Sequence, residues 1–376
     1  MNNRLKMVLL LGLSALATSG LWARDLSKLD LLGSELATIA EQGDMVGLQV
    51  AVRGSEGLLF SHAYGEVAAD SPRPVDEETL FLIASCSKPF ASACLLSLIN
   101  DAEVEIDLSD EIGRWIPAFE SIEVKGDGPA TRAPTVEELM AHRAGIYSQK
   151  VGMNRRQTQW IRDFRNSLEV AVDGILESPL IAQPGELYAY SGAGYCVLGR
   201  VAEAAAGESF EALLQERICK PLGLSRTTYF PAGDYPDREI ATGVPRATSP
   251  HRLGEEHQLP LIGGSLYTTA EEMTLFGVSI LNGWKGDGSR LEIPEGLIKE
   301  LGKVRSTKTN YSLGWKVVKR NGAVVRLSHS GSLNSHRAWL AVDLEKGVSV
   351  AACWTLSGSD RQAPVTEVLQ QYLIGD

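Results

Sequence analysis

The sequence predicts an α/β protein of the α+β kind, in which a mainly antiparallel sheet is built from both chain ends and flanked by helices. Runs typical of strands occur near the beginning and near the end of the chain, whereas the stretch from about Thr79 to Asn282 has mostly helical periodicity. The connections between neighbouring strand runs are short enough for hairpins, which favours antiparallel pairing. The helical middle is therefore expected to be a large subdomain inserted into the sheet.

We expect the first residues to be a targeting signal rather than part of the folded domain. Arg4 and Lys6 precede an uncharged run from Met7 to Ala23, and small residues stand at two candidate cleavage points, Ala17 and Ala23. This pattern is typical of a signal peptide, here residues 1–23, and predicts an exported protein, periplasmic or secreted. The alternative is an uncleaved amino-terminal anchor, the one case in which we expect membrane attachment, although the run is shorter than the roughly 20 residues that span a bilayer.

Residues 24–376 are then expected to form one domain. Leu29, Leu32, Leu36 and Ile39 follow one another at steps of three and four, which predicts an amphipathic helix over residues 25–40. Two β-type runs come next, residues 47–53 and 58–64, and the Gly-containing segment between them predicts a hairpin.

The expected helical part covers residues 79–309. Thr135-Val-Glu-Glu138 and Thr269-Ala-Glu-Glu272 have the spacing of capping boxes, which open helices. An arginine-rich stretch between Ile146 and Val172 favours a solvated helix face, and a lid over a site is the alternative.

Strands return at the carboxyl end. Three short apolar runs, residues 323–327, 338–342 and 348–354, predict strands, and Val365, Val368, Leu369 and Tyr372 lie on one face of a closing helix. Residues 310–376 should therefore join residues 24–78 in the α/β part of the domain.

Composition excludes several classes of function. The 36 basic and 47 acidic residues give a net charge of −11, which argues against a nucleic-acid partner because phosphate binding needs a basic field. The five cysteines are widely scattered, so one disulfide is conceivable but most should be small core residues. The six histidines include no pair at helical ligand spacing, and we expect no metal and no cofactor.

The first chemical motif is Ser85-Cys-Ser-Lys88, directly before an apolar helical run. Ser and Lys three positions apart at the start of a helix lie on the same face, so the Lys88 amine can reach the Ser85 hydroxyl. A serine hydroxyl is a poor nucleophile unless a neighbouring base takes its proton. Backbone N–H groups at the helix start can stabilise negative charge on an acyl oxygen.

Two further motifs make the pattern specific, Tyr190-Ser191-Gly192 and His329-Ser330-Gly331-Ser332. With the segments 139–146, 221–227, 263–269 and 313–315 in the same order, the chain resembles the serine β-lactamase and penicillin-binding-protein-like family, in its class C-type branch. That branch also holds D,D-carboxypeptidases, D-amino-acid peptidases and carboxylesterases. The resemblance covers nearly the whole mature chain and implies a β-lactamase/transpeptidase-like fold.

The resemblance also implies roles for individual residues. Ser85 resembles the family's nucleophile, Lys88 its proton partner, and Tyr190 the general base that later protonates the leaving group. The backbone N–H groups of Ser85 and Ser332 would form the oxyanion hole, and the substrate would lie along Gly192, His329, Ser330 and Gly331. Because a free phenol has a pKa near 10, Tyr190 would need the charge of Lys88 to favour its anion.

Two departures from the family pattern narrow the expected activity. Gly192 stands where the family has an Asn, so the site loses an amide donor and acceptor, which favours an esterase or peptidase over an efficient β-lactamase. His329 stands where many members have Lys, and an imidazole binds a carboxylate strongly only when it is charged.

These observations predict an exported serine hydrolase that works through an acyl-enzyme. The expected substrate is a small-molecule ester, a D-configured amide or a peptidoglycan-like compound, with esterase-like activity favoured. One alternative is a class C-type β-lactamase or D,D-carboxypeptidase. The other is a non-catalytic binding protein that keeps the β-lactamase fold.

Overall fold

The computed structural model describes residues 26–42, 45–149, 153–236, 239–245, 249–358 and 364–374. The expected signal peptide, residues 1–23, lies outside the described residues.

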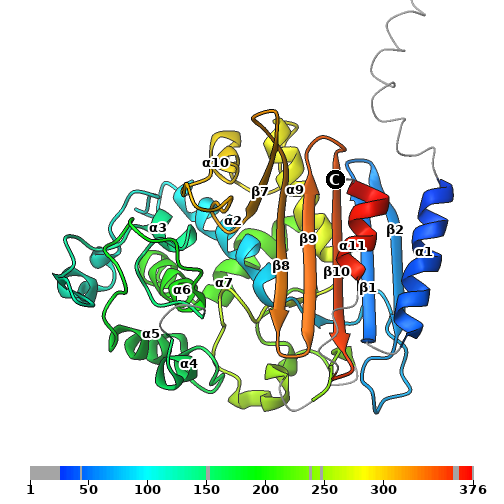
Figure 1. Cartoon of the computed structure of the whole chain (residues 1–376), viewed down its shortest axis with the longest axis horizontal. Coiled ribbons are helices and arrows are strands. Elements are labelled where there is room, and N and C mark those ends of the chain that lie inside the picture. The colour runs from blue at the N-terminus through cyan, green and yellow to red at the C-terminus, as the bar shows by residue number, and fades with distance from the viewer. Residues whose placement is uncertain are drawn as a thin grey trace, which may run out of the picture.

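The main sheet has the strand order β2-β1-β10-β9-β8-β7, and every neighbouring pair is antiparallel. Figure 1 shows the long strands side by side, with the helical part beyond β8. The strands are β1 (Met45–Gly54), β2 (Gly57–Gly65), β7 (Lys316–Arg320), β8 (Ala323–Leu333), β9 (His336–Asp343) and β10 (Val348–Leu356). Short two-stranded pairs lie outside it: β3 (Phe81–Leu82) with β6 (Tyr267–Thr268), and β4 (Glu123–Val124) with β5 (Gly128–Pro129).

The sheet joins the two ends of the chain, as predicted. β1 and β2 form the expected hairpin, and β1 pairs on its other side with β10, where Ala51 lies opposite Ala351. The predicted strands at the carboxyl end are observed as β8, β9 and β10. Strand β7 was not predicted, because its sequence Lys-Val-Val-Lys-Arg is short and mostly charged. The predicted fold class is thus confirmed.

Helices cover both faces of the sheet. On one face α1 (Leu26–Glu41) and α11 (Val365–Leu369) lie against each other, as Figure 1 shows, and Leu32, Leu36 and Leu369 pack onto Val50 and Val350 of the strands. On the other face α9 (Ala270–Lys285) contacts β1, β9 and β10. The largest hydrophobic cluster lies on this second side and continues into the helical part.

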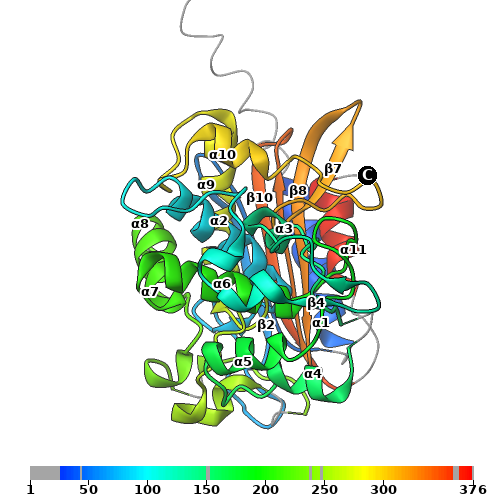
Figure 2. The same ribbon diagram turned by 90° about the vertical axis from the view of Figure 1, so that its left-hand side faces the viewer.

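The helical part, which faces the viewer in Figure 2, surrounds the buried helix α2 (Ser87–Ile99). Because α2 is enclosed, apolar residues occur around its whole circumference rather than on one stripe. Its other helices are α3 (Val136–Met140), α4 (Arg155–Trp160), α5 (Leu168–Leu176), α6 (Gly192–Ala206), α7 (Phe210–Leu214), α8 (Lys220–Leu222) and α10 (Glu295–Glu300).

The two predicted capping boxes behave differently. At α3 the box is complete, since Thr135 accepts the Glu138 N–H and the Glu138 carboxylate accepts the Thr135 N–H. At α9 Thr269 accepts the Glu272 N–H, but the Glu272 carboxylate instead accepts from Thr227 and from the Arg226 N–H. The second carboxylate therefore ties α9 to a neighbouring loop.

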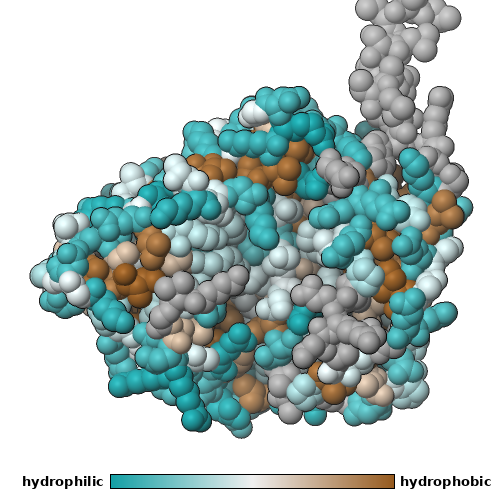
Figure 3. All heavy atoms as spheres, in the orientation of Figure 1, coloured by the Kyte–Doolittle hydropathy of each residue, from teal (hydrophilic) through white to brown (hydrophobic). Residues whose placement is uncertain are grey.

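The five cysteines are buried and free, so none forms the disulfide that the sequence left open. Over the described ranges, no helix has the length and apolar character needed to cross a bilayer. The same ranges contain no group of three His, Cys, Asp or Glu placed to hold a metal ion. On the face in Figure 3 the surface is mostly polar, and its apolar side chains form separate patches.

Candidate active site

Ser85 lies on a single 3-10 turn, Ala84–Cys86, that runs directly into α2. Ala84 has a left-handed backbone with φ of 49°, so the chain bends sharply just before Ser85. The turn packs against β8, where a Cβ on Gly331 would lie 2.1 Å from the Ile83 carbonyl oxygen. Glycine at position 331 is therefore required for the third motif to approach the first this closely.

Lys88 comes from the first turn of α2 and is only 1% exposed. Its Nζ donates to the Gly263 carbonyl oxygen at 2.7 Å and to the Ser85 hydroxyl at 3.4 Å. Burial disfavours the ammonium and lowers the pKa of Lys88 to about 7. A substantial fraction of Lys88 is therefore a neutral amine near pH 7, able to accept a proton.

Tyr190 ends the loop before α6, and its ring lies 4.7 Å from the Lys88 Nζ. Its side chain shares a hydrogen bond with Ser85. Burial raises the pKa of Tyr190 above its usual value, and the bond to Ser85 offsets this only partly. The Tyr190 anion would need the charge of Lys88 beside it, and burial disfavours both charges in the resting site.

The start of α6 fixes Tyr190. The Ser191 hydroxyl accepts from the Gly194 N–H at 2.9 Å and donates to the Tyr147 carbonyl oxygen at 2.6 Å. The Ser191 N–H donates to Nδ1 of His142 at 3.1 Å, and the His142 ring lies 4.3 Å from the Tyr190 ring. His142 is thus a positioning residue, which stands in a family segment of the sequence but was given no role there.

The space beside Gly192, where the family has Asn, is filled by a side chain from outside the motif. Its N–H donates to Oε1 of Gln149 at 3.1 Å, and a Cβ at position 192 would lie 2.4 Å from Nε2 of Gln149. The carboxamide of Gln149 thus fills the space where the side chain of the family's asparagine would begin. The site regains an amide group near Ser85, which the sequence alone suggested to be lost.

The third motif lies on the part of β8 that has a free edge. β7 pairs with β8 only as far as Ser328, so His329 and the residues after it pair with β9 alone. Leu333 and His336 close a two-residue turn, and the alternation of antiparallel pairs then directs the Ser332 N–H away from β9. Ser332 lines the same cavity as Ser85, so both predicted oxyanion-hole residues face one space.

His329 does not present a charge to this space. Its Nε2 pairs with the Tyr311 hydroxyl at 3.0 Å and its Nδ1 with the Ser330 carbonyl oxygen at 2.8 Å. The bond at Nδ1 assigns the proton to that nitrogen. Burial and the nearby Lys88 charge lower the pKa of His329 to about 3, so it is neutral at physiological pH. The strong carboxylate contact that a charged His329 would allow is therefore not available.

The cavity at Ser85 is small, about 40 Å³. Besides Ser85, Lys88, Gly192 and Ser332, its lining residues are Ala84, Gln149, Ile161, Arg162, Leu261, Gly263, Gly264 and Leu333. His329, Ser330 and Gly331 lie next to Ser332 on β8. Gln149 and Arg162 were not predicted as site residues. Gln149 follows a family segment, and Arg162 belongs to the arginine-rich stretch for which a solvated face or a lid was expected.

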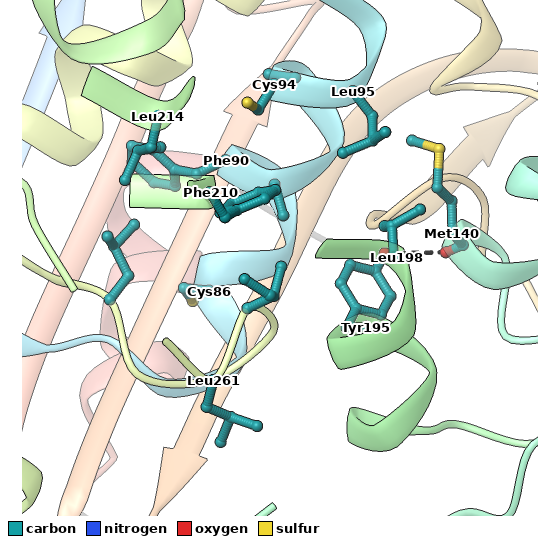
Figure 4. Packing of buried hydrophobic residues seen from close by; sticks show 14 of the residues in the cluster. Cys86, Phe90, Cys94, Leu95, Met140, Tyr195, Leu198, Phe210, Leu214 and Leu261 are labelled. Carbon is teal, nitrogen blue, oxygen red and sulfur yellow. Dashed lines mark hydrogen bonds between the residues drawn. The ribbon is translucent and has the colours of Figure 1, made fainter. Parts of the chain in front are cut away.

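A rigid core lies behind the site. Figure 4 shows Cys86 and Phe90 on the segment that carries Ser85 and Lys88, and Tyr195 beside Leu198 on α6. The Tyr195 hydroxyl donates to the Met140 carbonyl oxygen at 2.9 Å, which ties α6 to α3. The sulfur of Cys86 contacts the His329 carbonyl oxygen at 3.3 Å. Buried contacts therefore join the three motifs.

Comparisons with known proteins show the family of the chain and its fold. The family model described as Beta-lactamase matches residues 34–372. Protein Rv1367c of Mycobacterium tuberculosis is 28% identical over 280 residues, which are 70% of this chain and 69% of that protein. Esterase EstB of Burkholderia gladioli is 26% identical over 230 residues, 58% of this chain and 56% of the esterase.

Among solved structures, EstCE1, a hydrolase with promiscuous acyltransferase activity, superimposes with a TM-score of 0.77 at 18% identity. The superposition covers 93% of this chain and 99% of EstCE1, and at this identity it shows the fold alone. The family model, by contrast, matches nearly the whole chain, motifs included. The chain is therefore a serine hydrolase-type enzyme that belongs to the β-lactamase family.

Proposed function

We propose that this protein hydrolyses esters through an acyl-enzyme formed on Ser85. The observation that carries the proposal is the placement of the Ser85 hydroxyl between two proton carriers, the Lys88 amine at 3.4 Å and the Tyr190 phenol. The low pKa of Lys88 supports a base role for its amine, and the raised pKa of Tyr190 supports a donor role for its phenol.

In the acylation step the neutral Lys88 amine takes the proton of Ser85 while the serine oxygen attacks the carbonyl carbon. The carbonyl oxygen becomes negative and accepts hydrogen bonds from the N–H groups of Ser85 and Ser332. The ester bond then breaks, and the Tyr190 hydroxyl gives its proton to the leaving oxygen. Ser85 is left acylated, Lys88 as ammonium and Tyr190 as phenolate, two opposite charges side by side.

Deacylation returns every proton. A water molecule attacks the acyl carbon and gives its proton to the Tyr190 phenolate. Ser85 leaves with the proton of the Lys88 ammonium, so the resting state is restored and the acid is released. The charge of Lys88 thus supports the Tyr190 anion during turnover, even though burial excludes that anion from the resting site.

Two features favour an ester of a small acyl group. The space at Ser85 is about 40 Å³, which suits a small acyl chain better than a bicyclic lactam. The relative EstB is an esterase by name. Export is proposed as well, on the pattern of residues 1–23.

The test is hydrolysis of 4-nitrophenyl butyrate by the full chain and by Ser85→Ala, together with labelling by a fluorophosphonate probe. We expect Ser85-dependent hydrolysis and a single adduct on Ser85. Full activity in Ser85→Ala would refute the proposal, and a folded protein with no adduct would favour the binding protein. Rapid turnover of a chromogenic cephalosporin, together with weak ester hydrolysis, would favour the β-lactamase instead.

A further inference from the structure

The cavity at Ser85 has an unusual charge balance. Its lining includes two basic side chains, Lys88 and Arg162, and contains no Asp or Glu among the described residues. Lys88 is buried behind Ser85 and engaged by Gly263. Arg162 instead lies where the cavity adjoins a larger hollow of about 440 Å³, which it also lines. We call this place, where the two hollows meet at Arg162, the mouth of the cavity; Asp163 and Arg165 also line the larger hollow.

The backbone around Arg162 is anchored on both sides. Ile161, directly before it, is 1% exposed and belongs to the main hydrophobic core. Phe164, two residues after it, is buried as well, and its carbonyl oxygen accepts the N–H groups of Gln258 and Leu259 at 2.8 and 3.1 Å. A turn anchored in this way fixes the backbone from which the Arg162 side chain reaches the mouth of the cavity.

The acidic groups nearby are already engaged by another arginine. The Nε of Arg165 donates to the Glu256 carboxylate at 2.7 Å, and its guanidinium lies 3.7 Å from the Asp163 carboxylate. In the part of the chain that the structure describes, no carboxylate forms an ion pair with Arg162. The Arg162 guanidinium stays charged at any working pH.

The third motif supplies no positive charge for binding an anion. His329 is neutral, buried and bonded to Tyr311, so β8 offers no cation to a substrate carboxylate. Arg162, which lines the same cavity as Ser332, offers one instead. A planar guanidinium suits a carboxylate, because two parallel hydrogen bonds can form.

We infer that the substrate carries a carboxylate, separate from the scissile ester, that binds the Arg162 guanidinium at the mouth of the Ser85 cavity. The inference rests on the proposed ester hydrolysis at Ser85 and specifies its substrate class. It disfavours substrates with a free ammonium group near the ester, such as esters or amides of unmodified amino acids. The Ser85 cavity has no acid in its lining, and the Asp163 carboxylate in the larger hollow already lies beside Arg165. The carboxylate lies on either the acyl side or the leaving-group side.

The experiment compares esters that differ in charge but little in shape. On the acyl side the series is 4-nitrophenyl hexanoate, 4-nitrophenyl hydrogen adipate and 4-nitrophenyl 5-(trimethylammonio)pentanoate. On the leaving-group side it is phenyl butyrate and 3-carboxyphenyl butyrate. Each is assayed with the wild type, Arg162→Gln and Arg162→Glu, and Ser85→Ala gives the background rate. Arg155→Gln is the matched control, since Arg155 is exposed on α4 and lines neither hollow.

In one of the two series we expect kcat/KM for the carboxylate ester to fall about tenfold or more in Arg162→Gln, as for loss of a charge-assisted hydrogen bond. The neutral ester should change less than twofold, Arg162→Glu should raise the relative rate of the cationic ester, and Arg155→Gln should change no ratio. The series that responds locates the carboxylate.

The decisive ratio is kcat/KM for the charged ester over kcat/KM for the neutral ester. If this ratio is equal in wild type and Arg162→Gln for both series, the inference is overturned. Ser85-dependent hydrolysis of the neutral esters would still uphold the proposed function. Absence of Ser85-dependent hydrolysis with every ester would instead refute the proposed function. Preference for the cationic ester in the wild type would contradict the inference directly.

Discussion

The buried Lys88 amine predicts the pH dependence of ester hydrolysis. Burial lowers its pKa from 10.5 to about 7, a difference worth about 5 kcal/mol against the ammonium form. If the neutral amine takes the proton of Ser85, kcat/KM on an uncharged ester should follow the fraction of neutral Lys88. That fraction is about a tenth one pH unit below the pKa and about nine-tenths one unit above it.

The logarithm of kcat/KM should therefore rise with pH at a slope of one up to about pH 7, and kcat/KM should be constant above about pH 8. Neither neighbouring histidine explains such a step, because the pKa of His329 is about 3 and burial holds the pKa of His142 well below 6.5. The assay is the initial rate on 4-nitrophenyl butyrate between pH 5 and 10, corrected with Ser85→Ala. Lys88→Arg keeps a charge but supplies no base, so it should lose about 10²–10⁴-fold in rate and show no step near pH 7.

A rate that climbs to pH 10 without a plateau would mean that Lys88 keeps its ordinary pKa and that burial does not suppress its charge. A flat profile from pH 5 to 9 would remove Lys88 from the proton transfer altogether. Circular dichroism of Lys88→Arg separates both outcomes from a failure to fold.

Particular contacts lead to three further predictions. Gly192→Asn should lower kcat/KM on small esters about tenfold, because its Cβ would displace the Gln149 amide. Gln149→Ala should relieve this loss of activity in the double variant. Additive effects of the two substitutions in steady-state kinetics would contradict the coupling between positions 149 and 192. Glu138→Ala should lower the free energy of unfolding by about 3 kcal/mol, since Arg132 loses its paired carboxylate and α3 loses its capping box. A loss under about 1 kcal/mol in urea denaturation would contradict this prediction. Expressed in a bacterial host with its first residues, the protein should be found in the periplasm or medium with an amino terminus at residue 18 or 24, as read by mass spectrometry; an intact, membrane-bound chain would support the anchor.

Much of the fold is predictable from local pattern. The hairpin of residues 47–64 and the strands β8 to β10 are rich in β-branched or apolar residues, and short turns fix their antiparallel order. Strand β7 escapes this reasoning because its place depends on pairing with β8 and not on its own charged sequence. Similarly, the surroundings of α2 are visible only in the assembled fold.

The motifs locate the site, but the charge states in it depend on tertiary contacts. Ser85, Lys88, Tyr190 and Ser332 stand in recognisable patterns, whereas the neutral state of His329 follows from its burial and from a bond to Tyr311, 18 residues away. The occupation of the Asn position by Gln149 involves residues 43 positions apart. Sequence spacing gives no measure of such contacts. The amide group that seemed to be lost at position 192 is therefore supplied by Gln149, from elsewhere in the chain.

The pairing of β1 with β10 has a consequence for biosynthesis. β1 occupies the second position in the sheet, but its partner on one side, β10, is the last of the described strands and is made about 300 residues later. Until β7 has been synthesised, the nascent chain holds only the β1–β2 hairpin of the main sheet, which is marginal in water. The six-stranded sheet can therefore be completed only once β10 has been made.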